Sequence, residues 1–338
     1  MKDGQERIVF IDLAKGFCIA LVVFYHSKGV LHCDYLMDNF LLSFRLPLYF
    51  FLSGLFFKDY GSFKRFITKK TNRLLIPFFF FYIIFSVFIP NLLHYTLGMN
   101  FETIVGWPSL WAFIWPGEYP NIPIWFLWCL FLMNVLFWLM RYIIMNYVGN
   151  NIDGILIILC IVSGITGYCL IDNYHTDYAT LFKALQSMPF FYFGYLFNTY
   201  NGLHVLQLLS TKKAILHIVT FLIPTIILTV FVSWPTLLTF YICGMMGTLF
   251  ILLLARVLNY MPLFSYIGRY SIIVLLTHGI IIRLLTPSYN YLSQYISITN
   301  TTMLMTVILL LSYYLIIPIM CCYLPFFTAQ RPLLREYR

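Results

Sequence analysis

The sequence predicts an all-α integral membrane protein with about ten transmembrane helices, and two observations support this fold class. Hydrophobic residues make up 61% of the 338 residues and charged residues only 10%, whereas a soluble domain carries about 25% charged residues. So few charges cannot cover the surface that a water-soluble fold of this length leaves exposed. The apolar residues also form runs of about 20, the length of a helix that crosses a bilayer. The composition therefore excludes a soluble globular enzyme, a disordered chain and a nucleic-acid-binding module.

Ten apolar segments have roughly the length of a membrane span. In chain order they are residues 8–30, 40–57, 74–93, 124–144, 155–171, 181–197, 214–232, 236–254, 271–285 and 302–324. The longest connection, residues 95–123, is rich in Pro, Trp and other aromatic residues, which is typical of an interfacial or re-entrant segment. The eight cysteines are scattered, and their spacing predicts neither a disulfide framework nor a metal site. We find no internal repeat and no soluble domain, so residues 1–338 are expected to form one membrane domain.

The charges predict the orientation of these spans. The chain has 21 Lys and Arg against 12 Asp and Glu, a net charge of +9, and basic residues of membrane proteins gather on the cytoplasmic side. With the N-terminus inside, most of the basic residues fall in cytoplasmic segments. An even number of spans then places the C-terminus inside as well. Both termini are therefore predicted to be cytoplasmic.

The first span contains the ionisable residues Asp12, Lys15 and His26. Such residues are costly in a bilayer and usually have a function. Lys15 and His26 lie about three helical turns apart on one face, roughly 16 Å along the axis. Asp12 lies one turn before Lys15 and can pair with it. The alternative is that Lys15 reaches the interface with its ammonium group, while His26 simply lies at the outer interface.

The second span contains Arg45, which precedes Pro47, and the pair Ser53-Gly54. Arg45 must face a partner or water, so it is either a charge clamp or an interfacial anchor. The small residues Ser53 and Gly54 allow a close helix approach or a cavity.

The connection between the second and third spans is strongly basic and has one acidic residue, Asp59. Its basic residues include Lys64, Arg65, Lys69, Lys70 and Arg73. Clusters of Lys and Arg at the start of a helix suit phosphate groups, so this connection is a candidate binding site for a polyphosphate. The alternative is that the cluster reports topology and binds anionic lipid.

Four further residues are candidates near the ends of later spans. Arg269 lies at the cytoplasmic mouth of the span 271–285, and His278 lies about two turns further in. His278 is either a buried, hydrogen-bonded histidine or a second catalytic or substrate-binding group. Glu118 and Trp125 lie just before and at the start of the span 124–144. Glu118 is expected at the outer face near His26, with a solvated loop acid as the alternative.

Five segments occur in the order found in the membrane-bound acyltransferase-3 family, which the chain resembles over its whole length. They read IDLAKGFCIALVVFYH, RLPLYFFLSGLFF, FKRFITKKTNRLLIP, IWFLWCLF and IGRYSIIVLLTH. The chain looks most like the fucose 4-O-acetylase-related branch, which modifies polysaccharides. The resemblance implies a multi-pass protein of the bacterial cytoplasmic (inner) membrane. Its reaction would be acetyl transfer from cytoplasmic acetyl-CoA to a hydroxyl of a cell-surface glycan or its lipid-linked precursor.

The resemblance also implies where the family's motifs fall. The basic residue and histidine of the first helix are Lys15 and His26, and the Arg-x-x-Arg motif falls on Lys70 and Arg73. Lys70 keeps the charge of the family's first Arg but lacks its bidentate fork. The outer-face acid maps to Glu118.

Together these observations predict the following roles. The catalytic residues are expected to be His26, Lys15, Arg45 and Glu118. The donor-binding residues are expected to be Lys69, Lys70, Arg73, Arg65, Arg269 and Ser53, and the acceptor-binding residues His278 and Trp125. Neutral His26 would act as general base, because an imidazole with an unperturbed pKa of about 6.5 suits that task near neutral pH. An acetyl-histidine relay is the variant.

Two other functions fit the same composition. A transporter or flippase of a glycan or polyol would also have many spans with charges inside them, but it would more often show repeated halves. An acyltransferase could instead use succinyl-CoA or acetylate a small metabolite. The expected partners are acetyl-CoA, a glycan acceptor and membrane lipids, with no metal and no nucleic acid. Homo-oligomerisation is left open.

Overall fold

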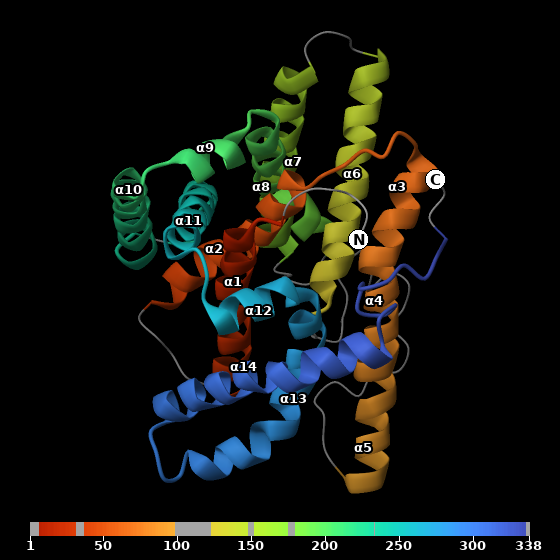
Figure 1. The fold of residues 1–338 in the computed structure, drawn as a ribbon, viewed down its shortest axis with the longest axis vertical. Coiled ribbons are helices and arrows are strands. Elements are labelled where there is room, and N and C mark those ends of the chain that lie inside the picture. Colours follow the sequence, from red (N-terminus) through yellow and green to blue (C-terminus); the bar gives the residue numbers. More distant parts are fainter. Residues whose placement is uncertain are drawn as a thin grey trace. The chain divides into compact units, whose positions relative to one another are not determined.

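The structure is a computed structural model, and it describes residues 7–31, 37–98, 123–147, 152–174, 180–232 and 234–335. Every regular element within these ranges is a helix, and no strand occurs among the described residues (Figure 1). The all-helical class predicted from composition is therefore confirmed for this part of the chain. Glu118, with its predicted role at the outer face, lies outside the described residues.

Seven helices of the described ranges are long and apolar enough to cross a membrane. They are α1 (Val9–Leu31), α6 (Trp125–Tyr147), α7 (Ile152–Tyr174), α10 (Thr211–Val230), α11 (Leu237–Leu258), α13 (Ser271–Leu292) and α14 (Ile298–Tyr323). Each coincides with a span predicted from the sequence. The other three predicted spans fall on α2 (Asp38–Leu55), on α8 (Thr180–Thr199) and on the helical segment that ends with α5. These are not among the seven, so the count of ten remains a prediction.

One long helical segment contains two π-helical turns. It consists of α3 (Phe63–Lys70), the π-helical η1 (Thr71–Leu75), α4 (Ile76–Phe81), the π-helical η2 (Tyr82–Phe88) and α5 (Ile89–Leu97). The segment begins at Ser62, whose side chain accepts a hydrogen bond from the N–H of Arg65, as an N-cap does. Pro77 and Pro90 lie in the first turns of α4 and α5. Because proline cannot donate to the carbonyl four residues earlier, each π-helical turn just precedes the helical turn that carries a proline.

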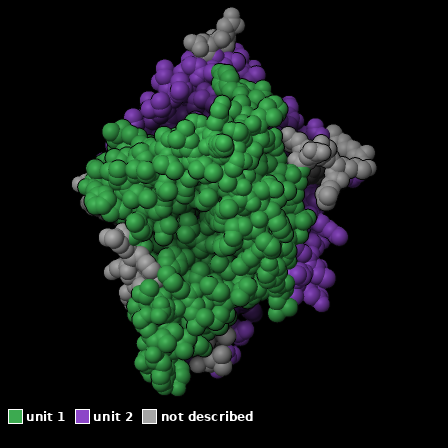
Figure 2. All heavy atoms as spheres, turned by 60° about the vertical axis from the view of Figure 1, so that its left-hand side comes forward, with its two compact units in different colours: residues 1–49, 197–317 green, residues 50–196, 318–338 purple. Residues whose placement is uncertain are grey.

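The chain forms two compact units, which Figure 2 distinguishes by colour. Unit 1 comprises Met1–Tyr49 and Phe197–Ile317, and unit 2 comprises Phe50–Leu196 and Pro318–Arg338. Each unit combines segments that are far apart in the sequence.

Unit 1 is built around α1, which packs against α11, α13 and the short helix α12 (Pro262–Arg269). The contact between α1 and α12 is a crossing of two glycines. A Cβ atom added to Gly16 would lie 1.9 Å from the carbonyl oxygen of Phe264, and one added to Gly268 would lie 1.8 Å from that of Asp12. The two backbones are therefore in direct contact, which only residues without a Cβ allow. On the other side of α11, Arg256 fixes α9 (Gly202–Leu208) by donating to backbone carbonyl groups.

Unit 2 has an aromatic core. The ring of Phe57 lies 5.0 Å from that of Phe137 on α6, which in turn lies 4.9 Å from that of Phe191 on α8. Trp138, one residue further along α6, stacks on Phe66 of α3. These aromatic pairs hold the basic helix α3 against α6. They thereby set the position of the charged side chains of α3.

Candidate functional site

Unit 1 contains two neighbouring histidines. The ring centroids of His26 on α1 and His278 on α13 are 5.2 Å apart, with an interplanar angle of 50°. His278 is completely buried, and the ring of Tyr25 lies 5.4 Å from that of His26. The structure thus brings together two residues that the sequence analysis singled out separately. Their distance along the chain concealed that they are neighbours.

The backbone fixes the tautomer of His278. Its Nδ1 atom lies 2.8 Å from the carbonyl oxygen of Val274, and a carbonyl oxygen only accepts, so Nδ1 carries the proton. Nε2 is therefore a hydrogen-bond acceptor, and it is buried without a hydrogen-bond partner among the described residues. The hydroxyl of Tyr313 also donates to Val274, at 3.4 Å, and lies 3.1 Å from the hydroxyl of Thr277. This network holds the ring and leaves one nitrogen lone pair available.

Arg45 is the buried cation of this site. The residue is 8% exposed, and its guanidinium carbon lies 3.8 Å from the centroid of the Tyr25 ring. That distance is within the range of a cation–π contact. The charge of Arg45 acts on both histidines. Arg45 therefore belongs to the His26–His278 site by position.

An ion pair lies beside Arg45. Lys28 of α1 donates to the carboxylate of Asp38 at the start of α2, and the Lys28 ammonium lies 5.9 Å from the centroid of the Tyr25 ring. The ring of Tyr25 thus has both cations as neighbours. The pair ties the end of α1 to the start of α2, the two helices that carry His26 and Arg45.

Lys15 and Arg269 lie near the glycine crossing. The backbone carbonyl of Lys15 accepts a hydrogen bond of 2.9 Å from the hydroxyl of Tyr49, and Lys15 directly precedes Gly16. Asp12, for which the sequence analysis expected a pair with Lys15, accepts a hydrogen bond of 2.6 Å from Arg7. Arg269 ends α12 and is exposed, with its guanidinium 5.2 Å from the ring of Tyr270.

Unit 2 contains the predicted phosphate-binding residues on α3 and η1, here named the basic segment. Its members are Lys64, Arg65, Lys69, Lys70 and Arg73. The Lys69 ammonium lies 4.3 Å from the centroid of the Tyr60 ring. The Lys70 ammonium lies 5.8 Å from the ring centroid of Phe57 and 5.6 Å from that of Phe66. Burial, together with the nearby charge of Arg73, lowers the pKa of Lys70 to about 7. The side chain of Lys70 therefore changes between its charged and neutral forms near pH 7.

The winding of η1 changes the expected geometry of the Lys70–Arg73 pair. In a regular α-helix, residues three apart are neighbours on one face. Instead, α3 ends at Lys70 and Arg73 lies within the π-helical turn, whose hydrogen bonds span five residues. The spacing is therefore that of a widened turn, although the two charges still interact.

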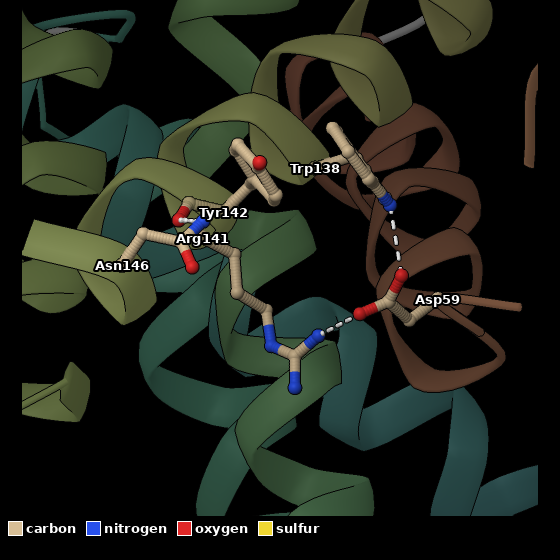
Figure 3. A network of polar contacts seen from close by, with 5 residues as sticks. All are labelled: Asp59, Trp138, Arg141, Tyr142 and Asn146. Atoms are coloured by element: carbon tan, nitrogen blue, oxygen red, sulfur yellow. Dashed lines mark hydrogen bonds and ion pairs between the residues drawn. The ribbon is translucent and has the colours of Figure 1, made fainter. Parts of the chain in front are cut away.

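The only acid of this connection is engaged elsewhere in unit 2. Asp59 accepts hydrogen bonds from Trp138 Nε1 at 2.9 Å and from the guanidinium of Arg141 at 2.6 Å (Figure 3). Tyr142 stacks on Trp138 with ring centroids 5.0 Å apart, and its carbonyl accepts a hydrogen bond from Asn146. The carboxylate thus pairs with an arginine of α6.

The remaining predicted residues are placed as follows. The hydroxyl of Ser53 accepts a hydrogen bond of 3.1 Å from the side chain of Asn134 on α6. A Cβ atom on its neighbour Gly54 would lie 1.8 Å from the carbonyl oxygen of Phe191, so this pair makes a close helix approach. Trp125 is the first residue of α6, and its ring lies 5.9 Å from that of Phe126.

Sequence reasoning missed several polar residues of these sites. Tyr25 directly precedes His26, and the adjacency of an aromatic ring to a candidate base was the available signal. Asn134 lies within an otherwise apolar helix and is completely buried, so a lone amide inside a span was the signal there. Asn72, within the basic segment's own turn, is 3% exposed. In the ranges that the structure describes, no group of three His, Cys, Asp or Glu side chains is placed to hold a metal ion.

Apolar helices of membrane-spanning length and a polar site inside them define a multi-pass membrane protein. The chain matches the acyltransferase-3 family, described as an acyltransferase domain, over residues 8–321. It therefore belongs to this family, which indicates a membrane acyltransferase. No curated protein and no solved structure gives a significant match.

Proposed function

We propose that the protein is an O-acetyltransferase of the bacterial inner membrane, of the fucose 4-O-acetylase-like branch. It transfers an acetyl group from cytoplasmic acetyl-CoA to a hydroxyl of a cell-surface glycan or its lipid-linked precursor. Its ten spans leave both termini in the cytoplasm. The observation that carries the proposal is the contact of His26 with the buried His278 beside Arg45, within a chain that matches an acyltransferase family.

His26 is the general base of the proposed reaction. Its imidazole takes the proton of the acceptor hydroxyl while the hydroxyl oxygen bonds to the carbonyl carbon of the thioester. The tetrahedral intermediate then collapses, the carbon–sulfur bond breaks, and the imidazolium returns the proton to the departing thiolate. His278 supports this role because Nε2 is a fixed acceptor beside the His26 ring. That atom can accept a hydrogen bond from a second hydroxyl of the acceptor sugar and hold the sugar in place, while the reacting hydroxyl donates to His26.

Arg45 is the proposed stabiliser of the oxyanion. A buried, preorganised cation stabilises the negative charge of the tetrahedral intermediate without having to reorient. The Tyr25 ring under the guanidinium and its burial supply that preorganisation. Lys15 remains the alternative stabiliser, and Glu118 the proposed acid at the outer face.

The basic segment is the proposed binding site for the phosphates of acetyl-CoA. Lys69, Lys70 and Arg73 supply cations, and Asp59, the acid of the same connection, pairs with Arg141 of α6. Phosphate groups bind most strongly to such clusters of charged donors. Arg65, Arg269 and Ser53 complete the proposed donor-binding set, and Trp125 is assigned to the acceptor.

The experiment uses the full chain in lipid nanodiscs with acetyl-CoA and an acceptor glycan. CoA release measures transfer, and calorimetry measures acetyl-CoA binding. His26→Ala should abolish transfer and retain acetyl-CoA binding, whereas His204→Ala, at an exposed histidine of α9, should behave as the wild type. Wild-type transfer by His26→Ala would remove His26 from the mechanism.

The same assay separates the alternatives. A transporter or flippase would release no CoA from acetyl-CoA. Succinyl-CoA in place of acetyl-CoA tests the donor, and a panel of small hydroxylated metabolites tests the acceptor. Loss of acetyl-CoA binding in Lys70→Ala with Arg73→Ala is expected. Unchanged binding would refute the assignment of the phosphate site.

A further inference from the structure

The C-terminal segment of unit 2 is hydrogen-bonded to the side chain of Asn72. The Asn72 amide nitrogen donates to the carbonyl of Leu334 at 3.0 Å, and its oxygen accepts from the N–H groups of Leu333 and Leu334 at 3.1 and 2.8 Å. Asn72 lies on η1 and is 3% exposed. One buried amide thus binds three backbone groups of a segment about 260 residues away.

A second contact directs the segment toward Asn72. Phe327 stacks on Phe80 of α4, with ring centroids 3.9 Å apart and an interplanar angle of 15°. The N–H groups of Gln330 and Arg331 both donate to the carbonyl of Pro325, which closes a turn between the two contacts. The chain therefore has a defined course from α14 past α4 to η1 (Figure 1).

At Leu333 and Leu334, burial of apolar side chains does not account for this docking. Leu333 and Leu334 are 50% and 44% exposed although the Asn72 amide holds their backbones. What the docking does place is charge, because Arg335 directly follows Leu334 and Arg73 directly follows Asn72. Consecutive Cα atoms are about 3.8 Å apart. Arg335 and Arg73 are therefore each held next to a residue that takes part in these three hydrogen bonds. Arg331, Arg335 and Arg73 are all exposed.

We infer that Arg331 and Arg335 join the basic segment in binding the phosphate groups of the CoA donor, with Asn72 as the positioning residue. This inference rests on the proposed function. CoA carries a diphosphate and a third phosphate, so several cations can contact it at the same time. Guanidinium groups bind phosphate oxygens in a bidentate manner, so two added arginines suit this ligand. Anionic lipid headgroups share the phosphate chemistry, and the experiment below distinguishes them.

The test measures the affinity for CoA of the full chain in nanodiscs of neutral phosphatidylcholine. Arg331→Gln with Arg335→Gln removes two exposed phosphate contacts and should weaken CoA binding about tenfold. Asn72→Ala should weaken it by a similar factor, because it releases the same arginines. The triple variant should be no weaker than either, since both changes remove one effect. Lys212→Gln with Lys213→Gln, an exposed basic pair on α10, removes equal charge and should leave CoA binding unchanged.

The outcomes separate the inference from the proposed function. Absence of CoA binding by the wild type would overturn both. Wild-type affinity in the double arginine variant would overturn the inference alone and leave the donor proposal intact. Weakening by Asn72→Ala without weakening by the arginine variant would also overturn it, because Asn72 would then be purely structural. If the arginine variant lost affinity only for nanodiscs containing phosphatidylglycerol, the segment would bind lipid headgroups, and the CoA assignment would fail.

Discussion

A methyl group at Gly16 should disturb the proposed catalytic pair without altering any group that takes part in the chemistry. The added Cβ would lie 1.9 Å from the carbonyl oxygen of Phe264, and ordinary contact begins at 3.4 Å. Relief therefore requires α1 and α12 to separate by 3.4 − 1.9, about 1.5 Å. The opposing atoms belong to the backbone, so no side-chain rotation can supply this space.

The displacement should reach His26 because α1 is one continuous helix from Gly16 to that residue. Its partner, His278, lies on α13, which follows α12 after Tyr270. A misplacement of about 1 Å can cost about a hundredfold in rate, and overpacking costs about 1–3 kcal/mol of stability. Gly16→Ala is therefore expected to lower the transfer rate at least a hundredfold while the protein stays folded.

The assay compares CoA release by Gly16→Ala and by Gly29→Ala, normalised to the monodisperse fraction on size exclusion. Gly29 lies on the same helix, and a Cβ there meets no atom within 4 Å, so this control should retain wild-type activity. Both changes have the same effect on helix propensity. Equal activity of the two folded variants would refute the link between the glycine crossing and the histidine pair.

Three further predictions concern single residues. The affinity for CoA should fall as the pH rises through about 7, because burial and Arg73 lower the pKa of Lys70 to about 7 and only the ammonium form attracts phosphate. Lys70→Arg stays charged, so its affinity for CoA should not fall over this pH range. If calorimetry shows the same fall in this variant, the pH dependence does not come from Lys70. His278→Ala should lower the transfer rate about a hundredfold and leave acetyl-CoA binding unchanged. A wild-type single-turnover rate in this variant would show that His278 is not part of the site. Asp59→Asn should reduce stability by about 0.5 kcal/mol, since the pair with Arg141 is partly exposed. Thermal unfolding would show no such loss in an Arg141→Ala background, and an equal loss there would argue against the ion pair.

The helices and their apolar character were predictable because hydropathy and length are local properties of the chain. The seven helices of spanning length all coincide with predicted spans. The predicted span 74–93 shows where local reasoning fails. Pro77 and Pro90 remain inside a continuous helical segment, and a π-helical turn precedes each of them. The hydropathy of that segment does not reveal the change in winding.

Of the candidate site, residue type and helical spacing identified Lys15 and His26 on one helix, His278 on another and the cations of the basic segment. Ionisable side chains in an apolar run are visible in the sequence because their cost in a bilayer makes them rare. The pairing of His26 with His278, the stacking of Arg45 on Tyr25 and the docking of the C-terminal segment on Asn72 appear only in three dimensions. Each joins segments that are distant in sequence, and such contacts depend on how helices cross. Those crossings are set by backbone contact at glycines such as Gly16, which hydropathy does not register.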